Sequence, residues 1–104
     1  MQVAACSSLD EVRLNIDRLD RQLLALIAER GAYVSQAAHF KKTVGEVEAP
    51  QRVAQVIVKL MALALEVGAE PAVVEATWRA MIGAFIEVER NAHAALHPPS
   101  QHLH

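Results

Sequence analysis

The feature that most constrains this sequence is an apolar seam that runs from Ser8 to Lys42. Apolar side chains recur along it at alternating steps of three and four residues, at Leu9, Val12, Ile16, Leu19, Leu23, Leu26, Tyr33, Ala37 and Phe40. This spacing predicts one long amphipathic helix with a seam like that of a coiled coil. Ser8 and Glu11 form a capping box, which marks where the helix starts.

The expected length of this helix predicts how the chain assembles. At 1.5 Å per residue the helix would be about 50 Å long. A compact monomer of this chain length has a radius of gyration of only about 13 Å, so the helix would extend far beyond it. The seam must therefore be covered by another chain, and we expect a homodimer.

Arg30 interrupts the seam in step with Leu23 and Leu26, and a guanidinium on an apolar stripe needs an anion beside it. Lys41 follows three turns later, rotated by only about 20° from Arg30. Arg13 precedes Arg30 by about 25 Å along the axis, too far for one small ligand to touch both on the same helix. A partner helix running antiparallel could bring its own Arg13 to the ligand.

Composition favours an all-α fold and excludes several other classes. The chain of 104 residues fits a single domain (1–104). Hydrophobic residues make up 53% of it and aromatic residues only 4%, a composition that suits helix packing better than a sheet. The net charge of −2 gives no general attraction to nucleic acid or acidic membranes. There is neither an apolar run of membrane-spanning length nor a signal segment. Cys6 is the one cysteine, which favours a reducing cytoplasm.

Two further helices are expected, which makes three in all. Pro50 suits the first turn of the second helix, and Gly68 is a natural stop for it. Its apolar stripe comprises Val53, Val56, Ile57, Leu60, Leu63, Ala64 and Val67. Pro71 opens the third helix, which ends before Pro98. Its buried face comprises Val74, Trp78, Met81, Ile82, Phe85 and Ile86.

Three stretches are expected to lack regular structure. Residues 1–7 read as a loose leader and residues 98–104 as a tail. Residues 43–49 contain a glycine and show little periodicity, so we expect a loop there.

Two polar residues stand in unusual positions. Arg52 lies in the first turn of the second helix, where the helix dipole disfavours a cation but free N–H groups attract anions. The alternative is a solvated arginine. Glu89 lies on the apolar face of the third helix, four residues after Phe85, and such a setting favours a protonated carboxyl group. The alternative is a structural ion pair with a lysine or arginine.

Metal and cofactor chemistry are not expected. His93 and His97 are four residues apart and could hold a metal from one helix. The helix should fray near Pro98, however, and no carboxylate partner is evident. The sequence has no Gly-rich phosphate loop, nucleophile elbow or cysteine cluster.

The order and spacing of five motifs resemble those of the all-α class of chorismate mutases. The motifs are Arg13, Ala28-Glu29-Arg30, Phe40-Lys41, Arg52 and Glu89, and the likeness runs from about Leu9 to His93. The family forms an intertwined homodimer of three-helix chains with two active sites. Each site takes one arginine from the partner's first helix, which agrees with the antiparallel arrangement inferred above.

The resemblance implies a role for each of these residues. Arg13 from the partner and Arg30 would bind the substrate's carboxylates, and Arg52 matches the arginine that opens the second helix. Lys41 would hydrogen-bond the ether oxygen and a carboxylate. Glu89 stands where many members have Gln and some have Glu, and it would donate to the ether oxygen. It must be protonated to do so.

Two positions depart from the mutase pattern. The family usually has a carboxylate three residues before the arginine of the second helix and another directly after it, and both contact the ring hydroxyl. Here those places hold Ala49 and Val53. This stretch is similar instead to that of isochorismate pyruvate lyases, which share the fold. The lyase-like members generally have Gln at the position of Glu89, which favours the mutase.

We therefore expect a cytoplasmic, homodimeric, all-helical chorismate mutase that binds a small dicarboxylate. It would turn chorismate into prephenate by electrostatic preorganisation, without cofactor or metal. The first alternative is an isochorismate pyruvate lyase with the same cationic site. The second is a non-catalytic helical dimerisation module in which Arg30 and Glu89 form structural ion pairs.

Overall fold

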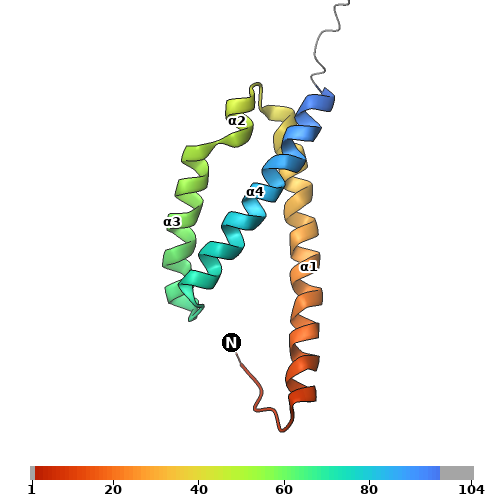
Figure 1. The fold of residues 1–104 in the computed structure, drawn as a ribbon, viewed down its shortest axis with the longest axis vertical. Helices are drawn as coiled ribbons and strands as arrows, with labels where there is room; N and C mark the ends of the chain where they lie inside the picture. The colour runs from red at the N-terminus through yellow and green to blue at the C-terminus, as the bar shows by residue number, and fades with distance from the viewer. Residues whose placement is uncertain (1, 97–104) are drawn as a thin grey trace, which may run out of the picture. The chain divides into compact units, whose positions relative to one another are not determined.

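The computed structural model describes residues 2–96, and its regular structure is entirely helical (Figure 1). The helices in chain order are α1 (Leu9–Phe40), α2 (Val44–Glu48), α3 (Pro50–Val67) and α4 (Pro71–Leu96). The all-α class and the three long helices are confirmed. The chain divides into two compact units, Met1–Ala32 and Tyr33–His104, and the boundary falls within α1. The predicted tail, 98–104, lies outside the described residues.

The start of α1 is capped as predicted, with one difference. The N–H of Glu11 donates to the hydroxyl of Ser8 at 3.1 Å, which is half of the capping box. The Glu11 carboxylate reaches one residue further than expected and accepts from the N–H and the hydroxyl of Ser7, at 2.8 and 3.0 Å. Both hydrogen bonds favour the ionised carboxylate and lower the pKa of Glu11 below its ordinary value, and the bond from the backbone N–H has the larger effect.

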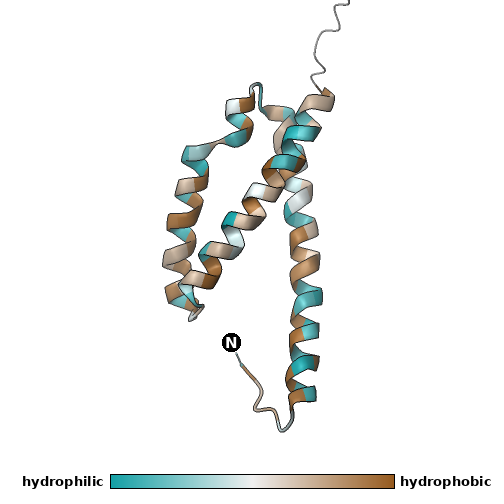
Figure 2. Cartoon of the chain, viewed as in Figure 1, coloured by the Kyte–Doolittle hydropathy of each residue, from teal (hydrophilic) through white to brown (hydrophobic). Residues whose placement is uncertain are grey.

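The apolar seam of α1 is exposed in the single chain. Figure 2 shows apolar residues along the whole helix, and it runs without a break through Gly31. The exposed members of the seam are Leu9, Val12, Ile16, Leu19, Leu23, Leu26, Tyr33 and Phe40. Monomeric proteins rarely expose so long an apolar stripe, so the seam has the character of a surface that a partner covers.

The core of the second unit lies where α4 packs against α3 and α2. Ile57 and Ala64 of α3 are buried, as is Ile82 of α4. Gly68 ends α3 in the left-handed conformation, at φ 73°, which glycine adopts without steric cost. Pro71 then opens α4. The predicted stop and restart are confirmed. The apolar faces are confirmed in part: Ile82 is buried and the other predicted members on α4 are half-buried, whereas Leu63 and Val67 of α3 are exposed.

The loop predicted at residues 43–49 is wrong, because a short helix, α2, forms there. Thr43 is its N-cap and accepts from the N–H of Glu46 at 3.1 Å. The Glu46 carboxylate accepts from the N–H of Lys42 at 2.7 Å. Thr43 and Glu46 thus form a capping box, a local signal that outweighs the lack of periodicity over so few residues. The first helix also ends two residues earlier than predicted, at Phe40.

None of the helices within residues 2–96 has the length and apolar character needed to span a membrane.

Candidate active site

Lys41 and Glu89 form an ion pair within the second unit. Glu89 lies on the buried face of α4 with Ile82 and His93, and only 4% of its surface is exposed. Lys41 follows the last residue of α1 and is half-buried. The predicted burial of Glu89 on the apolar face is confirmed. The pairing also agrees with the structural alternative, so the catalytic role of Glu89 stays a prediction.

An open depression of about 610 Å³ lies beside this pair. Its lining comprises Lys41, Gly45, Glu46, Ala49, Pro50, Gln51, Arg52 and Gln55. The structure thus brings Lys41 and Arg52, two of the predicted site residues, to one concave surface. Because Lys41 also contacts Glu89, three of the five predicted residues are linked within one unit.

The start of α3 favours an anion in this depression. Arg52 is exposed in the first turn, and no acidic residue lies in that turn. Ala49 precedes the helix as its N-cap but offers no side-chain hydrogen bond to the free N–H groups. The partial positive charge of the helix N-terminus and the charge of Arg52 therefore both favour an anion at the start of α3. Ala49 and Val53 add no carboxylate beside this charge, and Glu46 is the acidic residue in the lining of the depression.

Ala49 adopts a conformation that is unfavourable for its side chain. Its φ of 40° and ψ of 57° lie in the left-handed region, where a Cβ costs about 1–2 kcal/mol. The residue both ends α2, donating to the carbonyl of Gly45 at 2.9 Å, and opens α3, accepting from Val53 at 3.0 Å. This single residue makes the sharp turn that joins the two helices lining the depression.

Arg13 and Arg30, the two predicted carboxylate-binding arginines, lie on α1 in the first unit. Arg13 is exposed and Arg30 is half-buried. Their membership of the site stays a prediction.

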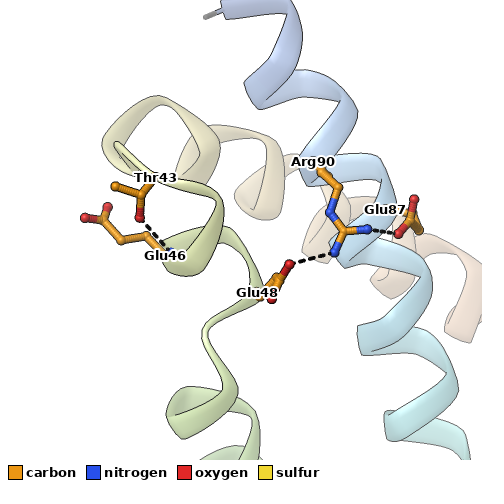
Figure 3. Close-up of polar contacts among 5 residues, drawn as sticks. All are labelled: Thr43, Glu46, Glu48, Glu87 and Arg90. Carbon is orange, nitrogen blue, oxygen red and sulfur yellow. Dashed lines mark hydrogen bonds and ion pairs between the residues drawn. The ribbon is translucent and has the colours of Figure 1, made fainter.

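Arg90, which the sequence did not single out, connects α4 to α2. Its guanidinium donates to Glu48 at 3.1 Å and also contacts Glu87, three residues earlier on α4 (Figure 3). The spacing of Glu87 and Arg90 could have suggested their pairing. The contact with Glu48, 42 residues earlier in the chain, has no local signal in the sequence.

His93 and His97, which were considered as a metal-binding pair and not expected to be one, cannot be examined together because His97 lies outside the described residues. His93 is buried one turn after Glu89. Within residues 2–96 no cluster of three or more histidine, cysteine or acidic side chains could hold a metal ion.

Comparison with known proteins places the chain in a family. The model of the family "Chorismate mutase type II" matches residues 12–90, which include all five predicted site residues. The chain therefore belongs to the chorismate mutase type II family, and the resemblance noted in the sequence is confirmed. An isochorismate pyruvate lyase of Pseudomonas aeruginosa is 31% identical over 81 residues, which cover 78% of this chain and 80% of the relative. Both enzymes considered from the sequence are thus represented.

Proposed function

We propose that this chain is a chorismate mutase that rearranges chorismate to prephenate. The observation that carries the proposal is the ion pair of Lys41 with buried Glu89, beside a depression that Arg52 also lines. This arrangement offers cationic groups to a dianion, and it places the donor Lys41 beside Glu89, which becomes a donor when it takes up a proton.

The reaction matches these side chains. In one step an ether C–O bond breaks while a C–C bond forms, so the protein needs no nucleophile. Cations that hold both carboxylates keep the substrate in its compact, reactive shape. Negative charge grows on the ether oxygen in the transition state, so donors aimed at that atom lower the barrier. We assign this role to Lys41 and to Glu89 in its protonated form.

We propose that the active enzyme is a homodimer. The exposed seam of α1 supports this, because its apolar side chains gain most from being covered by a second copy. In an antiparallel pair each site would combine Arg30 with the partner's Arg13. The single Cys6 favours a reducing, cytoplasmic location.

A second candidate function is that of an isochorismate pyruvate lyase. Ala49 and Val53 favour it, since neither can contact a ring hydroxyl as the family's carboxylates do, and so does the name of the Pseudomonas relative. A carboxylate at position 89, where lyase-like members generally have Gln, favours the mutase instead. The two substrates carry the same pair of carboxylates, so the cationic groups described above suit both.

Supplying chorismate and isochorismate side by side to the purified chain separates these functions. We expect loss of chorismate absorbance with formation of prephenate, and at most weak release of pyruvate from isochorismate. Lys41→Ala should abolish turnover, whereas Lys59→Ala, at an exposed lysine of α3, should not change it. Faster turnover of isochorismate would establish the lyase. No turnover of either substrate would favour the dimerisation module.

A further inference from the structure

Two neighbouring residues of α4 contact the chain on the two sides of the short helix α2, one before it begins and one at its last residue. Glu89 pairs with Lys41, which precedes α2. Arg90 pairs with Glu48, the last residue of α2. We propose that Arg90 is a positioning residue that holds residues 41–52, the segment that supplies most of the lining of the depression, in their binding conformation. The proposal rests on the function proposed above.

Helix α2 depends on contacts outside itself because it has only five residues. A helix of this length is not stable on its own in water. Thr43 caps its beginning and buried Val47 anchors its middle. At its end, the chain turns at once through the unfavourable conformation of Ala49, and there Glu48 is tied to Arg90. Loss of the ion pair between Arg90 and Glu48 would therefore allow the C-terminal end of α2, next to the strained Ala49, to lose its helical conformation.

The end of α2 also determines where Arg52 lies. Glu48 precedes Arg52 by four residues, with only Ala49 between α2 and α3. A shift of Glu48 therefore shifts the first turn of α3 and its arginine. Arg90 is itself held by Glu87, so the guanidinium is fixed from its own helix while it reaches across to α2 (Figure 3).

The expected effect is on binding rather than on stability. Both side chains are partly exposed, 39% for Arg90 and 49% for Glu48, and such pairs contribute little to the stability of the fold. Substrate binds only to chains whose binding segment is ordered, so KM rises about two- to fivefold if the ordered fraction falls to about a half to a fifth of its wild-type value. Arg90→Gln should therefore raise KM about two- to fivefold. It should leave kcat nearly unchanged, because Lys41 and Glu89 are intact.

The test compares Arg90→Gln, Glu48→Gln and the double variant with a matched control. The control is Arg79→Gln, which removes an ion pair of 2.9 Å to Glu75 within α4 that joins no second element. Assays use whichever of chorismate and isochorismate the wild type turns over. Both single variants and the double variant should show the same rise in KM, since each removes the same tie. Arg90→Lys should recover part of it, and Arg79→Gln should leave KM unchanged.

Hydrogen exchange gives a readout that does not need turnover. Amides of residues 44–53 should exchange faster in Arg90→Gln and Glu48→Gln than in the wild type or in Arg79→Gln. Unchanged exchange would overturn the proposal, as would faster exchange without a rise in KM, or additive effects in the double variant. If the wild type turns over neither substrate, the proposed function fails, and the exchange comparison alone decides whether Arg90 positions this segment.

Discussion

At the scale of single residues, Glu89 is the side chain whose protonation would decide the proposed chemistry. It lies buried on α4 and contacts the ammonium group of Lys41. In the proposed reaction the ether oxygen of the substrate can use only a donor, so Glu89 would have to carry its proton in the productive complex. A carboxylate in that position would repel the charge that develops there.

We therefore expect kcat/KM to fall as the pH rises. Glu89→Gln supplies a permanent amide donor of nearly the same size, so it should flatten the fall and keep activity at alkaline pH. The measurement is the pH profile of kcat/KM, with Glu75→Gln on the same helix as control. A flat wild-type profile, or a Gln variant that is inactive at every pH, would show that Glu89 is structural.

Ala49 yields a prediction about stability. Glycine adopts a φ of 40° without a Cβ clash, so Ala49→Gly should relieve the steric cost at this turn. Glycine also gives the unfolded chain more entropy, which offsets part of the gain. The net effect should be a rise of about 0.5–1 kcal/mol in the free energy of unfolding. Ala54→Gly, in the exposed interior of α3, should instead lower it by about 1 kcal/mol. Urea denaturation measures both. If the two variants lose stability equally, the turn at Ala49 is not strained.

At the scale of helices, periodicity predicted the long elements and their buried faces, and this is why Glu89 could be identified. The apolar stripe of α4 is a local pattern, and its burial follows from the pattern. Helix α2 was missed because five residues are too few to show a period, although Thr43 and Glu46 signalled a cap. The contact of Arg90 with Glu48 depends on packing between α4 and α2, which no local pattern contains.

The start of α1 should respond to acid. Its cap uses ionised Glu11, whose pKa is lowered in the folded chain by the N–H and hydroxyl of Ser7. The stabilisation is present above the unfolded-state pKa and is lost as the pH falls through the folded value. Ser7→Pro removes the N–H donor as well as the hydroxyl, so it should raise the pKa of Glu11 more than Ser7→Ala. An NMR titration of the side chain measures this, and equal pKa values in all three chains would contradict the cap.

At the scale of the whole molecule, the proposed active site needs a second copy of the chain. The seam of α1 is long, apolar and exposed in the single chain. Arg13 and Arg30 are separated by about 25 Å along one helix, so they can serve one small substrate only across an antiparallel interface. The proposed shared site can therefore exist only if the chain forms the proposed dimer.

That claim is tested most directly by mixing two inactive variants. Arg13→Ala and Arg30→Ala chains should each lose nearly all turnover alone. When they are refolded together in equal amounts, half of the dimers pair one variant with the other. In each such heterodimer one site collects both defects and the other keeps both arginines. The mixture should therefore regain about a quarter of wild-type activity. Persistent inactivity, with heterodimers demonstrated by two different affinity tags, would contradict the shared site.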